Sequence, residues 1–279
     1  MVTTGMNRNA LRTMRGLLSA GWVLLLAASL TPATDAQAAS GIANTKHNLG
    51  TAGTKENHLA TGTGEICVFC HTPHGSDSSA AAPLWNKKVP DASSMTTYTS
   101  PTMFNSTTVT GNMSLACLSC HDGSQAMDTV LNAPGSGGYN ASGATMGTWQ
   151  GANQSAGKIT GIAKIGTDLS NDHPVGMKYR NLTGETTGIG AEFKPMSGTN
   201  PLFYVESGIS TGGGSASARD KFDLWLFPTF SGGSSDGVAR VECATCHDPH
   251  TENATFLRVT NSTETGGTAS GLCLTCHLK

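Results

Sequence analysis

The segment Cys67-Val68-Phe69-Cys70-His71-Thr72-Pro73-His74 decides how this chain of 279 residues is organised. Its first five residues have the spacing C-x-x-C-H, and the same spacing returns at residues 117–121, 243–247 and 273–277. Together the four motifs use all eight cysteines of the sequence. C-x-x-C-H is the attachment signature of c-type haem.

The spacing of each motif suits the chemistry of haem attachment. Two thiols three residues apart on one turn of chain face the same way, so each can add to one vinyl group of a single porphyrin, and the next residue supplies the proximal imidazole to the iron. We therefore predict four covalently bound haem c groups. Thioether links are predicted at Cys67, Cys70, Cys117, Cys120, Cys243, Cys246, Cys273 and Cys276. The predicted proximal iron ligands are His71, His121, His247 and His277.

Paired cysteines also have other uses in proteins. C-x-x-C occurs in zinc sites and in thiol redox sites, and eight cysteines could form four disulfides. None of these uses explains why every second cysteine is followed by histidine. The absence of a leftover cysteine favours haem further.

The composition fits a chain that is built around cofactors. Hydrophobic residues make up 37% of the sequence and glycine contributes 35 residues, which is a poor composition for an ordinary core. Porphyrins offer large flat apolar surfaces on which side chains can pack. We expect a mostly irregular fold with short helices at the haem motifs and a few short strands, wrapped around a chain of four haems. The formal net charge of −2, with no basic cluster, gives no indication of nucleic-acid binding.

Residues 1–38 have the features of a cleaved export signal. The first part carries arginines, residues 17–30 are apolar, and Ala36-Gln37-Ala38 places small residues at the cleavage positions. The apolar run is shorter than the roughly 20 residues that a membrane-spanning helix needs. We expect cleavage after Ala38 and a mature protein outside the cytoplasm, where c-type haem is attached in bacteria.

The predicted mature chain, residues 39–279, is expected to be a single tetrahaem domain with three parts. A first haem pair spans residues 65–125, and a second pair spans residues 240–279. Between them, residues 126–236 are rich in glycine, serine and threonine, so we expect mainly loops there. Within this insert, apolar residues alternate over positions 222–227, which is a weak strand signal.

Five further histidines are candidates for the distal sides of the haems. They are His47, His58, His74, His173 and His250. His74 and His250 each lie three residues after a proximal histidine. Residues three apart on a helix share one face, so the two histidines of such a pair cannot bind one iron from opposite sides and must serve different haems. The proline between them disfavours helical backbone in the residue before it, which frees the second histidine to reach a neighbouring haem.

The other candidates have less distinctive surroundings. His173 lies between an aspartate and a proline in a segment with turn character, and we interpret it as a distal ligand. His58 lies in a polar stretch without a recognisable pattern. A surface position without a ligand role is the alternative for each of these histidines.

Several of these segments together resemble a known family. The segments are Cys67-Val68-Phe69-Cys70-His71-Thr72-Pro73-His74-Gly75, Pro83-Leu84-Trp85-Asn86, Cys117-Leu118-Ser119-Cys120-His121-Asp122-Gly123, Asp172-His173-Pro174-Val175-Gly176 and Cys243-Ala244-Thr245-Cys246-His247-Asp248-Pro249-His250. They look like the doubled C-x-x-C-H cytochromes. Within that group they are similar to the OmcE-type outer-surface tetrahaem cytochromes, which polymerise into extracellular electron-conducting filaments. The loops between the motifs are unspecific.

The resemblance implies that each haem has two histidine ligands and that the chain is exported past the outer membrane. His47 matches the family's His-Asn-Leu element, whereas His58 has no counterpart, so the implied distal ligands are His47, His74, His173 and His250. The implied function is extracellular electron transfer by a subunit of a homopolymeric filament. Periplasmic or outer-membrane cytochromes would donate the electrons, and metal oxides or other cells would accept them.

Two other functions stay open alongside this one. A monomeric periplasmic electron shuttle would use the same haem chemistry. A multihaem reductase would keep one iron open for substrate. Nitrite reductases of that kind usually carry C-x-x-C-K at the catalytic haem, and no such motif occurs in this sequence. Because five spare histidines also favour fully coordinated irons, we expect an electron carrier and not an enzyme.

His47 lies near the predicted mature N-terminus on an arm with many glycines and threonines and few apolar residues. One hypothesis is that this arm docks on the adjoining subunit and that His47 completes a haem there, which would give an open filament. The alternative is that His47 binds a haem of its own subunit.

Overall fold

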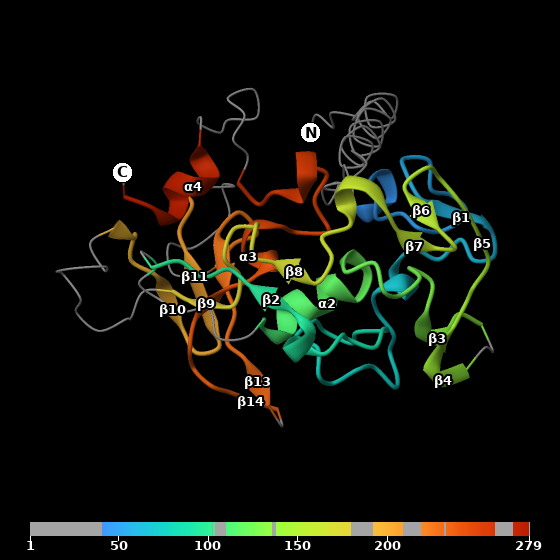
Figure 1. The fold of residues 1–279 in the computed structure, drawn as a ribbon, viewed down its shortest axis with the longest axis horizontal. Helices are drawn as coiled ribbons and strands as arrows, with labels where there is room; N and C mark the ends of the chain where they lie inside the picture. The colour runs from blue at the N-terminus through green and yellow to red at the C-terminus, as the bar shows by residue number, and fades with distance from the viewer. Residues whose placement is uncertain are drawn as a thin grey trace, which may run out of the picture. The chain divides into compact units, whose positions relative to one another are not determined.

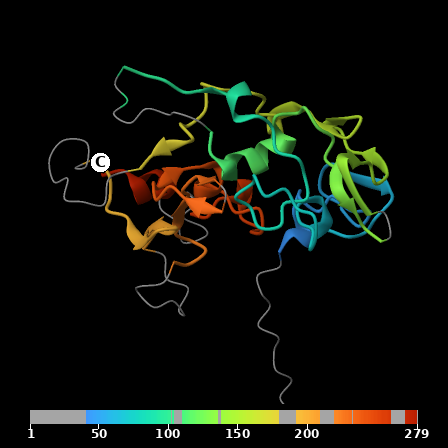
Figure 2. The same cartoon turned by 90° about the horizontal axis from the view of Figure 1, so that it is seen from below.

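The computed structural model describes residues 41–101, 103, 110–135, 138–179, 192–208, 219–231, 233–259 and 270–278. The predicted export signal, residues 1–38, lies outside the described residues. Residues 40–279 form one compact unit, drawn from two directions in Figures 1 and 2. Among the residues that the structure describes, no helix has the length and apolar character needed to cross a membrane.

The helices are short, and the four C-x-x-C-H motifs lie on or at them. The first motif begins in the 3-10 turn η2 (Cys67–Phe69), the second ends α2 (Asn112–His121), the third forms α3 (Cys243–Cys246) and the fourth ends α4 (Gly271–Cys276). The other described 3-10 turns are η1 (Ile42–Asn44), η3 (Ala92–Ser94), η4 (Gly161–Ala163) and η6 (Ala254–Phe256).

The strands are short and pair in small separate sheets. They are β1 (His58–Thr61), β2 (Thr96–Thr97), β3 (Val130–Ala133), β4 (Gly138–Ala144), β5 (Thr148–Gln150), β6 (Gln154–Ser155), β7 (Lys158–Ile159), β8 (Asp168–Leu169), β9 (Met177–Lys178), β10 (Ser197–Thr199), β11 (Leu202–Val205), β12 (Leu224–Leu226), β13 (Phe230–Ser231), β14 (Ser234–Ser235) and β15 (Arg240–Val241). In the described part of the chain, β10, β11 and β12 form the three-stranded sheet, and the other sheets are two-stranded. The β2–β8 pair is parallel and the other named pairs are antiparallel.

The insert is richer in strands than its composition predicts. Residues 126–236 contain the strands from β3 to β14, whereas mainly loops were expected there. The reason lies in the turns, as the β6–β7 hairpin illustrates. Ala156 and Gly157 have φ angles of 49° and 74°, and a two-residue hairpin turn of type I′ needs positive φ at both positions. Part of the glycine in the insert thus closes hairpins.

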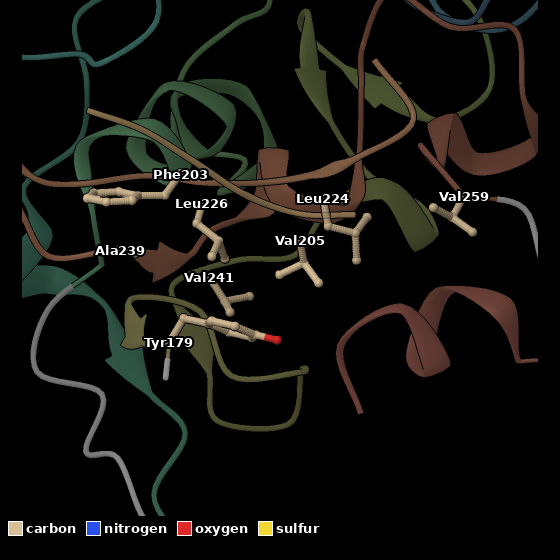
Figure 3. Close-up of a cluster of buried hydrophobic side chains, with 8 residues drawn as sticks. All are labelled: Tyr179, Phe203, Val205, Leu224, Leu226, Ala239, Val241 and Val259. Atoms are coloured by element: carbon tan, nitrogen blue, oxygen red, sulfur yellow. The ribbon is translucent and has the colours of Figure 1, made fainter. Parts of the chain in front are cut away.

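The largest apolar cluster lies around strands β11 and β12. Phe203 faces Leu226 and Val205 faces Leu224 across this pair, and all four are buried. Figure 3 shows these side chains gathered with Tyr179 and Val241. The strand expected at positions 222–227 is therefore confirmed by β12. Cys276 and Leu272 of α4 pack against the same cluster, so it supports the fourth haem motif.

A second apolar cluster supports the first and second motifs. Its buried members are Leu49, Leu59, Phe69, Met127 and Ile159. Cys70 and Cys120 both pack against it, which brings the first two motifs together. A third, smaller cluster lies under α2 through Leu115 and Leu118.

Two buried polar residues fasten the insert to the first motif. Asn86 donates from its side chain to the carbonyls of Val68 and Asn132, at 2.6 and 2.9 Å. Lys87 is fully buried, and its Nζ donates to the carbonyl oxygens of Ala126, Met127 and Thr129. Three carbonyl acceptors satisfy an ammonium group that would otherwise be costly to bury.

The second and third motifs are joined by one buried carboxyl group. Glu242 precedes Cys243 as the N-cap of α3, where it forms a capping box with Thr245. The same carboxyl accepts a hydrogen bond from Ser114 Oγ in the first turn of α2. Gly111 permits this approach, because a Cβ at that position would collide with the Glu242 carboxylate. The second view shows α2 alongside the segment that carries the third motif (Figure 2).

Candidate haem-binding sites

Each motif folds so that its first cysteine and its histidine lie on one turn. The backbone N–H of His71 donates to the carbonyl of Cys67 at 2.8 Å. The corresponding bonds join His247 to Cys243 at 3.1 Å and His277 to Cys273 at 2.9 Å. In the second motif the whole pentad lies inside α2. This local geometry is what thioether attachment with a proximal imidazole requires.

The proximal imidazoles are oriented by backbone carbonyls from outside their own motifs. Nδ1 of His71 donates to the carbonyl of Pro83 at 2.6 Å, Nδ1 of His121 to that of Ala163 at 2.8 Å, and Nδ1 of His247 to that of Thr255 at 2.7 Å. Since a carbonyl only accepts, Nδ1 carries a proton, and in the neutral imidazole Nε2 is then the nitrogen with a free lone pair. Metal-bound histidines are held in this way, so these three residues fit the proximal role.

The cysteines of successive motifs lie close to one another. Cys70 lies near enough to Cys120 for their thiols to interact electrostatically, and the same holds for Cys117 with Cys243 and for Cys246 with Cys276 and Cys273. The attachment points therefore follow one another in space in the order first, second, third and fourth motif.

The thiols of the motifs differ in their surroundings. All eight cysteines lie within the described residues and none forms a disulfide. Burial raises the pKa of Cys70 and of Cys246 to about 12, whereas the neighbouring Cys117 thiol lowers the pKa of Cys243 to about 7. Among the described residues, no group of three or more His, Cys, Asp or Glu side chains is arranged to hold a metal ion.

His250 faces the proximal histidine of the first motif. The ring centres of His71 and His250 lie 6.2 Å apart, and their planes differ by 15°. Nδ1 of His250 lies 3.1 Å from Asp248 Oδ1, an acceptor, and Nε2 of His250 makes no hydrogen bond to the described residues. A histidine that follows the third motif is thus brought to the first.

His47 lies beside the proximal histidine of the second motif. Its ring centre is 6.2 Å from that of His121, at an interplanar angle of 76°, and it stacks on Phe256 at 4.3 Å. Burial, assisted by the charge of His121, lowers the pKa of His47 to about 4, which keeps the imidazole neutral. A neutral imidazole is the form that binds iron.

The arm that carries His47 packs against its own chain, whereas one of the two hypotheses from the sequence had it reach outward. Leu49 is buried in the second apolar cluster, and Thr45 and Asn48 are also buried. Asn44 donates to Glu252 Oε1 at 2.9 Å. A single buried leucine and several polar contacts therefore hold the arm against its own chain. The low apolar content of the arm gave no indication of this attachment.

His173 lies at a cavity next to the fourth motif. This cavity of about 390 Å³ is lined mainly by apolar atoms, and Cys273, Cys276 and His277 line it together with His173 and His247. Its size and lining are typical of sites for flat apolar cofactors. His173 itself is exposed, and its Nδ1 lies 3.1 Å from the carbonyl of Pro174.

The last two candidates differ in how their rings are held. Both ring nitrogens of His58 are engaged, with the carbonyl of Glu56 at 2.9 Å and with Nε2 of Gln150 at 2.5 Å. His74 is exposed, and its side chain makes no hydrogen bond or ring contact in the described part of the chain. Its backbone carbonyl accepts from Thr72 Oγ1 at 3.0 Å and from Asn132 Nδ2 at 2.8 Å. The structure therefore does not bring His74 to a proximal histidine.

Sequence reasoning missed the residues that orient the ligands. They are the carbonyls of Pro83, Ala163 and Thr255, together with the carboxylate of Asp248. The segment Pro83-Leu84-Trp85-Asn86 gave a signal, since it stood out beside the motifs, but its spacing did not reveal an acceptor for His71. The carbonyls carry no sequence signal at all.

Comparison with known proteins supports the haem interpretation over part of the chain. Residues 236–279, which contain the third and fourth motifs, match the family described as the doubled CXXCH motif. No curated protein matches the chain. The match and the four preorganised motifs indicate a multihaem c-type cytochrome that binds haem c covalently and transfers electrons.

Proposed function

We propose that the chain is a tetrahaem electron carrier in which each of the four irons is coordinated by two histidines. The observation that carries this proposal is the orientation of the proximal imidazoles, three of which present an unprotonated Nε2 because Nδ1 donates to a fixed carbonyl. Such an arrangement prepares a ligand position on each of these three motifs. In this proposal the haems supply reversible one-electron chemistry, and the protein supplies spacing, axial ligands and surroundings.

The order of the motifs supports a relay through the molecule. Thiols of the first and second, second and third, and third and fourth motifs lie near one another. Cys67 of the first motif and Cys273 of the last are exposed, whereas the other six cysteines are partly buried. Electrons would therefore enter and leave at the two ends of the series, and the middle would be shielded from solvent.

Loading and coordination can be tested on the purified native protein. We expect the denatured polypeptide to carry four haems by mass and to keep its colour in acidic acetone. We also expect low-spin spectra in both oxidation states and little binding of carbon monoxide by the reduced protein. Loss of colour from the polypeptide would refute covalent loading. A high-spin signal worth one haem would instead favour a reductase with an open iron.

We further propose that the protein is exported and polymerises end to end at the outer cell surface. Two exposed relay ends suit contact with further copies, and a head-to-tail interface that does not close gives a filament. His74 lies exposed beside the first motif, so it could complete a haem of a neighbouring copy. His47 is less suited to that role because it packs inside its own chain. Cytochromes of the periplasm or outer membrane would donate electrons, and metal oxides or other cells would accept them.

Electron microscopy of the native protein tests assembly. Filaments that disappear in His74→Ala and persist in His58→Ala would support the proposed interface. A native protein that stays monomeric at all concentrations would point to a periplasmic shuttle with the same haem chemistry.

A further inference from the structure

We propose that His250 is the sixth ligand of the haem attached at Cys67 and Cys70, and that His47 is the sixth ligand of the haem attached at Cys117 and Cys120. This assignment rests on the proposed function and adds to it which histidine serves which iron. It also places two differently oriented ligand pairs in one molecule.

The distances between the rings carry the assignment. A metal–imidazole bond is about 2.0–2.1 Å long and the bound nitrogen lies about 1.1 Å from its ring centre, so two imidazoles on opposite sides of one ion have centres about 6.3 Å apart. The centres of His71 and His250 are 6.2 Å apart, and those of His47 and His121 are also 6.2 Å apart. Each pair therefore has room for one iron between its rings.

The hydrogen bonds of these rings leave the nitrogen atom available that the proposed iron coordination needs. His71 and His121 have Nδ1 bound to carbonyls, and His250 has Nδ1 beside the carboxylate of Asp248. Nε2 is thus the available atom on these three rings. The His47 ring lies beside the backbone of Pro249 and stacks on Phe256.

One loop supports both pairs. The residues after the third motif provide His250 itself, Pro249 and Phe256 as contacts of His47, and the Thr255 carbonyl that orients His247. The loop from 248 to 256 therefore holds groups that serve the first, second and third haems. This fixes the three haems relative to one another more firmly than cysteine attachment alone.

The two pairs differ in a property that spectroscopy can measure. The planes of His71 and His250 differ by 15°, whereas those of His47 and His121 differ by 76°. In low-spin ferric haem, near-parallel imidazole planes lift the degeneracy of the iron d orbitals and give a rhombic electron paramagnetic resonance spectrum. Near-perpendicular planes leave the orbitals almost degenerate and give a highly anisotropic signal with one large g value. Both kinds of signal should occur in the oxidised protein.

The test is electron paramagnetic resonance of the fully loaded, oxidised protein and of three variants. His250→Gly should remove rhombic low-spin intensity worth one haem and create a high-spin signal, and added imidazole should restore low spin. His47→Gly should do the same to the highly anisotropic signal. His58→Ala is the matched control, because its ring is held by Glu56 and Gln150, and it should leave the spectrum unchanged.

The outcomes separate this assignment from the proposed function. If His250→Gly keeps its full low-spin intensity with four haems attached, the assignment is wrong although the carrier function stands. If either variant removes the signal assigned to the other pair, the pairing is also wrong. Should a glycine variant fail to fold, His250→Met retains a possible ligand; it should show the near-infrared methionine–iron band, and an unchanged spectrum would overturn the assignment. A native protein without haem would instead refute the function.

Discussion

The segments that end the first and third motifs have the same spacing but different surroundings. The second histidine is exposed in both segments, but in residues 71–74 its side chain makes no hydrogen bond within the described residues, whereas in residues 247–250 it faces His71 with ring centres 6.2 Å apart. The cause lies in the residue after each proximal histidine. Thr72 bonds to the backbone carbonyl of His74, while Asp248 bonds to the ring of His250.

Asp248 is itself held in place by a buried arginine. Arg258 Nη1 lies 3.5 Å from Asp248 Oδ2, and the guanidinium also donates to the carbonyls of Ala244 and Lys221 and lies over the ring of Trp225. Within the described part of the chain, Thr72, the corresponding residue of the first motif, has no such charged partner. Spacing thus places a histidine near a haem, but a fixed acceptor decides where its ring points.

The two motifs also differ at their helix starts. The buried carboxyl of Glu242 caps α3 and reaches α2, whereas Ile66 precedes Cys67 without any side-chain cap. The third motif is therefore tied to the second through an ionisable group. The first motif is tied to its surroundings through neutral contacts, such as those of Asn86.

The largest expected effect of removing the ionisable link of the third motif is on the pH dependence of stability. Burial raises the pKa of Glu242 from its usual 4.5 to about 8, so the native state holds the proton more tightly than the unfolded state. The contribution of Glu242 to the free energy of unfolding should be fully present below its unfolded pKa of 4.5. It should fall as the pH rises toward about 8, by at most about 1.4 kcal/mol per pH unit. Glu242→Gln should abolish this slope in urea titrations at several pH values.

The matched control for this measurement is Glu65→Gln, since Glu65 is an exposed carboxylate close to the first motif. It should keep the wild-type slope. An unchanged slope in Glu242→Gln would mean that the contacts of Glu242 with Ser114 and Arg240 stabilise its charged form more than burial opposes it.

A smaller effect is expected from giving the third motif the residue of the first. Asp248→Thr removes the acceptor for His250 and the charge partner of buried Arg258, so we expect the free energy of unfolding to fall by about 1–3 kcal/mol. Because the ring is less firmly held, carbon monoxide binding to the reduced protein should also rise. Asp248→Asn keeps an oxygen acceptor and should change the carbon monoxide binding less. Equal binding in both variants would contradict an orienting role for the acceptor.

The smallest effect is expected at the corresponding position of the first motif. Thr72→Val removes a hydroxyl that bonds only to the backbone of His74, and that carbonyl keeps its bond from Asn132. We expect a loss of less than about 1 kcal/mol and unchanged haem spectra. A spectral change as large as that of Asp248→Thr would show that the two positions act alike.

Some of the fold was accessible from the sequence and some was not. The strand over 224–226 could be predicted because alternation is a local pattern. The hairpins of the insert were missed because glycine-rich composition does not distinguish a tight turn from a loop. The packed N-terminal arm was missed because the partners of Leu49 and Asn44 lie elsewhere in the chain.

The sequence by itself determined the attachment chemistry of this protein. Two cysteines and a histidine within five residues lie on one turn of chain whatever surrounds them, so C-x-x-C-H specifies haem attachment locally. Only the tertiary structure decided the orientation and pairing of the histidines. The acceptor for His121 lies 42 residues away at Ala163, and His71 meets a ring from the third motif. A carbonyl acceptor can come from any residue, and a ring direction depends on long-range packing, so neither leaves a pattern in the sequence.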